Sequence, residues 1–327
     1  MGRGLFVVDG VTGNVIWQAG PVAPSTLSTG QVFKTIAGMT FAIPSDVGVL
    51  DRNSDGYADR FYVGDTGGNV WRADINDVSP VNWTVNKLAS LGFAASPTVG
   101  NRRKFLFSPD VVYTNDANGL YDAVVIGSGD REHPFNGYGD TAHPLINAVT
   151  NRFYMIKDRS TGFTFSGATT IETDLFDTTD NLIQEGTSAQ IASATNALAA
   201  ANGWFITLLP GEKTVSSVVT LGNATFFNTN QPTPPAPGVC ASNLGLAREY
   251  TVGLQTGASV IAYNTTAGLT SASRYVKHAG GGYPPSPVGA IVQVAGRLQQ
   301  VVLSGTSVLQ PPATPIGARI RKFWNQR

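Results

Sequence analysis

Short apolar runs alternate with glycine-bearing turns along almost the whole sequence, and few folds accommodate such a pattern. Residues 5–8 and 14–17 flank a polar turn at residues 9–13, which is typical of a β-hairpin. The chain has 37 Gly and 19 Pro among its 327 residues. So many turn residues suit a protein made of many short strands. The sequence therefore predicts an all-β fold.

The same pattern recurs toward the C-terminus. Further strand candidates lie at residues 47–50, 61–64, 69–74, 111–113, 123–127, 152–157, 204–209, 217–227, 248–254, 259–263, 290–294 and 298–303. Four-stranded units of about 40–50 residues are typical of propeller blades, so this length accommodates about seven of them. We predict one domain over residues 1–327, a modified seven-bladed β-propeller with an inserted helix and long loops.

Two segments depart from the strand pattern. Residues 188–202 are rich in alanine and end at Asn202-Gly203, which predicts an inserted helix with a C-terminal stop. Residues 231–238 carry four prolines and predict an exposed loop between blades. Three tryptophans lie in or beside strand patterns and are predicted to be core residues: Trp17, Trp71 and Trp204.

The balance of charges argues against a nucleic-acid partner. Lys and Arg number 22, as do Asp and Glu, so the formal net charge is zero. A protein that binds phosphates through basic side chains would carry a basic surplus. Only 13% of residues are charged and 42% are hydrophobic, a composition that supports a large core and excludes a disordered chain.

The N-terminal region resembles neither a membrane span nor a leader peptide. No apolar run approaches the roughly 20 residues of a membrane-spanning helix, and residues 1–20 lack the basic start and apolar stretch of a signal peptide. We therefore expect a fragment of a longer secreted protein whose signal lies upstream. Cys240, the single cysteine, excludes an internal disulfide; we expect a free thiol, with pairing to an upstream cysteine as the alternative.

The most specific motif is the acidic segment at residues 51–59. Oxygen-bearing side chains occupy alternate positions at Asp51, Asn53 and Asp55, a glycine follows at position 6, and Asp59 adds a carboxylate. This spacing predicts a chain curled around Ca²⁺, with the Tyr57 carbonyl and water as further ligands. Three carboxylates within nine residues repel one another, and a cation relieves that repulsion.

The segment differs from an EF-hand. Tyr62 occupies the position of the bidentate glutamate, and apolar strand-like runs replace both helices. The loss of that glutamate predicts weak binding, on the order of 10⁻⁴–10⁻³ M. The competing interpretation is an ordinary hairpin turn, since Asp, Asn and Gly are also common turn residues. Because all the ligand types fall in register, we favour calcium.

A second candidate, Asp116, Asn118 and Asp122, is a shortened version of the first. It has fewer ligands, and Asn118-Gly119 is itself a strong two-residue hairpin turn. We therefore favour the turn and expect one calcium site.

Residues 127–134 place Ser, Asp, Glu and His close together, but they lack the strand and helix context of a nucleophile elbow. We expect Asp130, Arg131 and Glu132 to form a hydrogen-bonded corner between blades. His143 and His278 are too isolated to suggest a zinc site.

With these motifs in view, the chain resembles the C-terminal β-propeller of the PilC/PilY-type type IV pilus biogenesis proteins. The resemblance is carried by residues 38–46 with 51–59 and 62–72, residues 125–134 with 151–155, residues 203–208 with 211–213 and, more weakly, residues 281–287. It implies a non-enzymatic module, exported to the bacterial cell surface, outer membrane or pilus tip, that acts in pilus assembly, surface attachment and twitching motility.

The resemblance also implies that calcium regulates pilus extension against retraction. The family's ligands map onto Asp51, Asn53, Asp55, the Tyr57 carbonyl and Asp59 without departure. The implied partners are pilus components, namely minor pilins and the pilus tip, and we expect a monomer. The family's variable N-terminal half is missing, so host or abiotic surface binding through that half is not assigned to this chain.

Two alternatives remain open. Residues 8–17 resemble the Asp…Thr-Gly…Trp blade motif of quinoprotein dehydrogenases, but a convincing copy occurs once and no cofactor pocket is evident. The other alternative is a structural adhesin propeller in which calcium is incidental.

Overall fold

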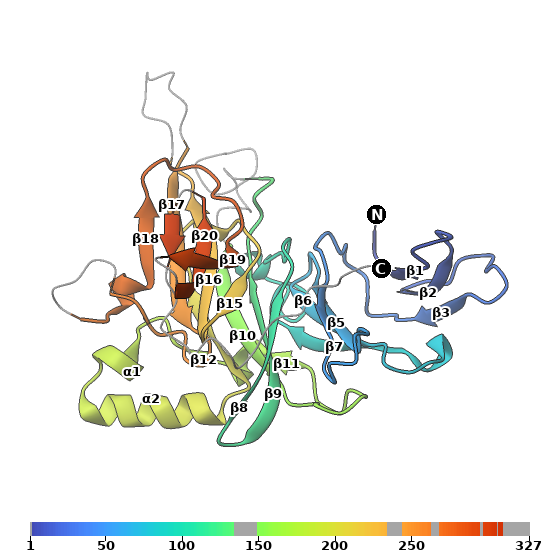
Figure 1. Cartoon of the computed structure of the whole chain (residues 1–327). Helices are drawn as coiled ribbons and strands as arrows, with labels where there is room; N and C mark the ends of the chain where they lie inside the picture. The colour runs from blue at the N-terminus through green and yellow to red at the C-terminus, as the bar shows by residue number, and fades with distance from the viewer. Residues whose placement is uncertain are drawn as a thin grey trace.

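The structure is a computed structural model that describes residues 2–133, 149–233, 244–262, 268–294, 297–305 and 307–309. His143, Cys240 and residues 234–238 of the proline-rich segment lie outside the described residues. The described part is built from successive small β-sheets (Figure 1), which confirms the all-β class. These residues form five sheets, and the total of seven blades stays a prediction.

Sheet 1 and sheet 2 come first in the chain. Sheet 1 contains β1 (Leu5–Val8), β2 (Val15–Gly20) and β3 (Val32–Thr35) in that order. Sheet 2 has the order β11-β7-β6-β5-β4, with β4 (Gly48–Leu50), β5 (Arg60–Gly64), β6 (Asn69–Asp74), β7 (Thr84–Ser90) and β11 (Thr170–Ile171). The predicted hairpin at residues 5–17 is present, and the strands predicted at residues 61–64 and 69–74 pair as a second hairpin.

Sheet 3 lies next to sheet 2 in space and contains the longest hairpin near the candidate site. Its order is β12-β13-β10-β9-β8, with β8 (Asp110–Asp116), β9 (Gly119–Gly127), β10 (Arg152–Asp158), β12 (Phe176–Asp177) and β13 (Gly203–Thr207). Gly48 of β4 approaches β8 so closely that an added Cβ would lie 2.6 Å from the Pro109 carbonyl oxygen. The segment after β10 joins sheet 2 through β11 and then returns to sheet 3 through β12.

Sheets 4 and 5 complete the described strands. Sheet 4 contains β14 (Lys213–Thr214), β15 (Val219–Leu221), β16 (Ala224–Gln231), β17 (Leu246–Gly253) and β18 (Tyr275–His278), and sheet 5 contains β19 (Val288–Val294), β20 (Arg297–Ser304) and β21 (Ser307–Leu309). The strand predicted at residues 217–227 is instead a hairpin of β15 and β16. Gly222 and Asn223 both adopt positive φ, as a tight hairpin turn requires.

The inserted helix is confirmed. Helix α1 (Leu182–Glu185) precedes α2 (Ser188–Ala200), and short 3₁₀ turns occur at Pro80–Asn82, Val99–Asn101, Glu172–Asp174 and Ser271–Arg274. Thr187 caps α2 through reciprocal hydrogen bonds with Gln190. Leu198 of α2 packs into an apolar cluster with residues of sheets 3 and 4. No helix in the described part of the chain is long and apolar enough to span a bilayer.

Aromatic packing holds sheets 3 and 4 together. The ring of Phe153 stacks on Phe227 with 3.6 Å between centroids, and Phe227 stacks on Tyr250 at 4.8 Å. Trp17, Trp71 and Trp204 are all buried, as predicted.

Candidate metal centre and its buried ionic partners

The acidic loop of residues 51–59 connects β4 to β5 at the edge of sheet 2. Its ends are closed by a hydrogen bond of 3.0 Å from the Asp59 amide to the Leu50 carbonyl. Ser54 and Gly56 have φ values of 61° and 95°, so the chain bends sharply at the position where the motif places glycine.

Local hydrogen bonds organise the predicted ligands in the first part of the loop. The Asn53 side-chain oxygen accepts from the Asp55 amide at 2.9 Å, and Asn53 Nδ2 donates to Asp55 Oδ2 at 3.0 Å. Asp51 Oδ2 accepts from the Gly56 amide at 3.0 Å. The structure therefore links Asn53 to Asp55 directly and holds Asp51 against the loop backbone at Gly56.

Asp59 and Tyr57 complete the predicted set in different ways. Asp59 is only 5% exposed, and its Oδ2 accepts from the amides of Arg52 (2.7 Å) and Asn53 (3.1 Å). The Tyr57 side chain is 74% exposed, which leaves the predicted role to its backbone carbonyl alone.

One atom bears directly on whether these residues fit a cation. Asp51 Oδ1 is buried and has no hydrogen-bond partner, which is costly for a carboxylate oxygen. An oxygen-only donor set with a partnerless buried carboxylate oxygen suits a hard cation such as Ca²⁺. Among the described residues no group of three or more His, Cys, Asp or Glu is placed to hold a metal ion. Coordination would therefore require the loop carboxylates to turn toward a common centre.

The second candidate site is dispersed among other partners. Asp116 accepts from Arg159 at 2.6 Å and lies 3.2 Å from Lys157, while Asn118 Nδ2 donates to the Ala199 carbonyl. Although partial burial acts to raise it, the hydrogen bond from Arg159 lowers the pKa of Asp116 to about 2. The turn between β8 and β9 consists of residues 117 and 118, one residue earlier than predicted. Gly119 follows with φ of 111°.

Asp122 belongs to a different group of side chains. Its fully buried carboxylate accepts from Arg52 at 3.2 Å, from Arg60 and from the Tyr62 hydroxyl at 3.0 Å. The structure therefore ties Asp122 to the loop of the first site through Arg52, which lies between two predicted ligands.

These contacts are part of a buried ionic network between sheets 2 and 3. Its members are Arg52, Arg60, Arg72, Asp74, Asp122 and Asp158. Arg72 donates to Asp74 and Asp158 at 2.8 Å each, and to the Ser160 carbonyl at 2.7 Å. Burial raises the pKa of Asp158, against the opposing effect of Arg72. Burial also raises the pKa of Tyr62, whose hydroxyl lies between two network carboxylates.

Sequence reasoning missed this network. The available signal was the presence of Arg60, Arg72 and Asp74 inside otherwise apolar strands. Arg72 and Asp74 are two residues apart on β6 and so face the same side of the sheet. Charged residues at that spacing in a buried strand require partners from a neighbouring element.

The segment around residue 130 contacts the chain that joins β7 to β8, and the predicted corner between blades stays a prediction. Asp130 pairs with Lys104 and with His133 Nδ1 at 3.0 Å, and the Arg131 guanidinium lies over the ring of Phe107. The Ser128 hydroxyl is buried and donates to Asn151 at 3.2 Å. The Ser128 hydroxyl also accepts from the Arg152 amide, while His133 pairs with Asp130, an arrangement that differs from a nucleophile hydrogen-bonded to its base.

The motif at residues 8–17 stabilises a turn. Asp9 Oδ1 accepts from the amides of Val11 (2.9 Å) and Thr12 (2.8 Å). Asp65 also accepts from backbone amides of the turn that follows it, which sequence reasoning missed. Its Oδ1 accepts from the Gly67 and Asn69 amides, and its Oδ2 accepts from Trp71 Nε1 at 2.8 Å. Asp9 is therefore held by its own turn, and Asp65 by its turn and by the following strand β6.

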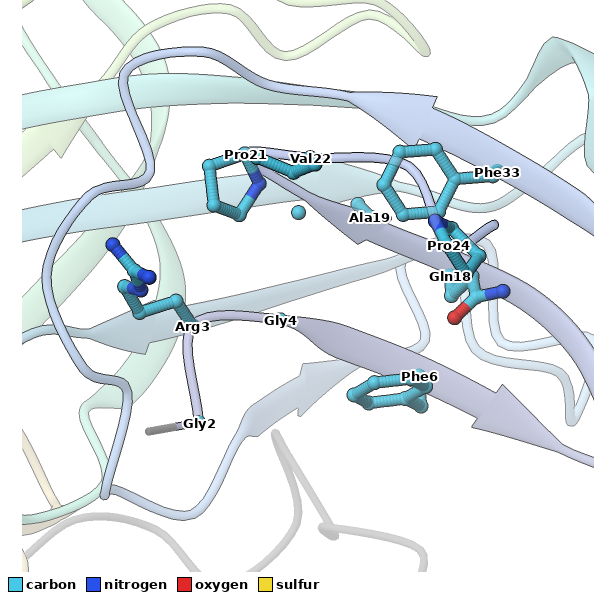
Figure 2. Close-up of a pocket in the computed structure, with 11 residues that line it drawn as sticks. Gly2, Arg3, Gly4, Phe6, Gln18, Ala19, Pro21, Val22, Pro24 and Phe33 are labelled. Carbon is cyan, nitrogen blue, oxygen red and sulfur yellow. The ribbon is translucent and has the colours of Figure 1, made fainter. Parts of the chain in front are cut away.

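A shallow cavity of about 370 Å³ lies on sheet 1 and is drawn in Figure 2. Its lining includes Arg3, Phe6, Gln18, Val22 and Phe33. Arg3 is the single ionisable side chain among the lining residues, so the cavity lacks a paired acid and base.

Comparisons with known proteins identify the fold to which these sheets belong. No family model and no curated protein matches the chain. The C-terminal domain of PilY1 from Pseudomonas aeruginosa matches with a TM-score of 0.58 and 15% identity, over 95% of this chain and 67% of that chain. This chain has the fold of the PilY1 C-terminal domain.

That likeness makes the sheets described above the blades of a modified β-propeller. The quinohemoprotein alcohol dehydrogenase of Comamonas testosteroni also matches, with a TM-score of 0.36 and 13% identity, over 91% of this chain and 36% of that chain. A TM-score this low supports no structural argument.

Proposed function

We propose that this chain is a calcium-binding propeller domain of a PilC/PilY-type protein that regulates type IV pilus biogenesis. In this proposal it biases pilus extension against retraction, and with it twitching motility and surface attachment. The proposal is supported by the sequence motifs of that family and by a shared fold over 95% of this chain.

The observation that carries the calcium proposal is the state of the Asp51 carboxylate. Its Oδ2 is held by the Gly56 amide, whereas its buried Oδ1 has no partner. A bound Ca²⁺ would supply positive charge there and neutralise the mutual repulsion of the loop carboxylates. Asp51, Asn53, Asp55, the Tyr57 carbonyl and Asp59 would hold it.

The domain acts in this proposal as a binding and regulatory module, not as an enzyme. Its partners are minor pilins or the pilus tip, it acts as a monomer, and it is exported to the bacterial cell surface. At tenfold its dissociation constant, calcium would stabilise the folded state by about 1.4 kcal/mol. That is enough to bias two nearly balanced conformations of the loop.

The test is calcium titration by calorimetry of the wild type, Asp51→Asn and Asp55→Asn. Asp59→Ala is less suitable, because it also removes the acceptor of two backbone amides. We expect both variants to lose calcium binding while their unfolding in EGTA stays close to wild type. Asp46→Asn is the matched control, since Asp46 lies just outside the loop and is exposed, as Asp55 is. Unchanged binding in both loop variants would refute the ligand assignment.

The two alternatives make different predictions. A quinoprotein dehydrogenase would show a quinone absorbance band in the purified protein, which we expect to be absent. A structural adhesin with incidental calcium predicts normal pilus number and twitching in cells carrying Asp55→Asn. We expect both to change in those cells.

A further inference from the structure

Arg52 connects the acidic loop to the neighbouring sheet. Its backbone lies between Asp51 and Asn53, yet its guanidinium reaches Asp122 of β9 at 3.2 Å. The guanidinium also lies 4.4 Å from the centre of the Tyr113 ring on β8. Ion pairing and stacking on a planar face together hold Arg52 in one orientation.

The network that receives Arg52 is balanced in charge. Three arginines (Arg52, Arg60 and Arg72) face three aspartates (Asp74, Asp122 and Asp158). The side chains other than Arg52 are at most 3% exposed, and that of Arg52 is 12% exposed. If Arg52 left, the buried group would carry an uncompensated negative charge, which is strongly unfavourable at low dielectric.

The loop in turn controls where Arg52 lies. The Arg52 and Asn53 amides both donate to Asp59 Oδ2, so a predicted ligand already fixes the Arg52 backbone. A cation bound by Asp51, Asn53 and Asp59 would restrain the chain on both sides of Arg52.

We infer that Arg52 couples cation occupancy of the acidic loop to the packing of sheet 2 against sheet 3. This inference rests on the proposed calcium function and states how cation binding at the loop affects the rest of the domain. A bound cation favours the conformation in which Arg52 reaches Asp122. By thermodynamic reciprocity, the Arg52–Asp122 pair raises the affinity of the loop for the cation by the same factor.

The sign of the effect separates this coupling from simple electrostatics. Arg52 places a positive charge beside the proposed site, so its removal should by itself strengthen cation binding. The coupling predicts the opposite, because loss of the pair frees the loop.

The experiment is calcium titration by calorimetry of the wild type, Arg52→Gln and Asp122→Asn, with hydrogen exchange of β9 in calcium and in EGTA. We expect Arg52→Gln to bind calcium at least about fivefold more weakly than the wild type. Calcium should slow exchange across β9 in the wild type, and only within the loop in Arg52→Gln. Asp122→Asn should weaken binding in the same direction.

Arg159→Gln is the matched control, since Arg159 also pairs with an aspartate and lies over a tyrosine ring on sheet 3. It should bind calcium as the wild type does. If Arg52→Gln does not fold, Arg52→Lys keeps the charge but loses the planar fork, and weaker binding is again expected.

The outcomes distinguish the two proposals. The coupling alone is overturned if the wild type binds calcium and Arg52→Gln binds it equally or more tightly. It is also overturned if calcium slows hydrogen exchange across β9 in Arg52→Gln as it does in the wild type. A wild type that binds no calcium overturns the proposed calcium function and the coupling with it.

Discussion

Arg72 is the central member of the buried ionic network, and its replacement by methionine tests how much that network contributes to stability. Its guanidinium donates to Asp74, Asp158 and the Ser160 carbonyl, and its side chain is fully buried. Arg72→Met keeps much of the apolar stem but leaves two buried carboxylates without this donor. Breaking a buried ion pair on one side costs about 3–5 kcal/mol.

That loss is large beside a total stability of about 5–15 kcal/mol. With an unfolding entropy of about 2.1 cal/mol/K per residue, a chain of 327 residues loses about 1.5 °C per kcal/mol, so the cost corresponds to a fall in melting temperature of about 4–7 °C. Urea denaturation followed by tryptophan fluorescence measures the loss in the free energy of unfolding directly. The double variant Arg72→Met with Asp158→Asn should be less destabilised than the sum of the single variants, because the neutral amide introduced at position 158 leaves no buried charge there.

The fall is measured in EGTA, so that calcium binding does not contribute to it. An Arg72→Met variant that loses less than about 1 kcal/mol, or single-variant costs that simply add, would contradict this account of the network.

Two further predictions concern packing and pH. Gly64→Ala should lower the free energy of unfolding, measured by urea denaturation, by about 1–3 kcal/mol, because the new Cβ would lie 2.4 Å from Phe105 Cβ. Gly10→Ala, whose new Cβ meets nothing within 4 Å, should leave that free energy nearly unchanged. The folded pKa of Asp116 is lowered from 3.8 to about 2, so its stabilising effect is present above pH 3.8 and is lost as the pH falls toward 2. Asp116→Asn should therefore flatten the urea-denaturation stability profile in that window, and an unchanged profile would show that the pairing with Arg159 does not contribute.

The acidic loop could be anticipated because its geometry is local. Asn53 bonds Asp55, and Asp51 bonds the Gly56 amide. Both contacts fall within six residues, so the spacing of these residues in the sequence predicts the bend. Its neighbour Arg52 carried no such signal. Its partner Asp122 is seventy residues away in the chain. The sequence pattern grouped that aspartate with Asp116 and Asn118, whereas in the structure it pairs with Arg52.

Local interactions explain what the amino-acid order alone determined: the strand and turn pattern, the capped helix α2 and the oxygen-rich loop. Each depends on residues a few positions apart, whose backbone preferences and short hydrogen bonds act before any sheet packs on another. The tertiary structure alone decided the partners of Arg60, Arg72 and Asp122, and the route by which the segment after β10 joins two sheets. Those choices arise because burying sheet 2 against sheet 3 removes water from charges far apart in sequence, and each charge must then find its counterion across the interface.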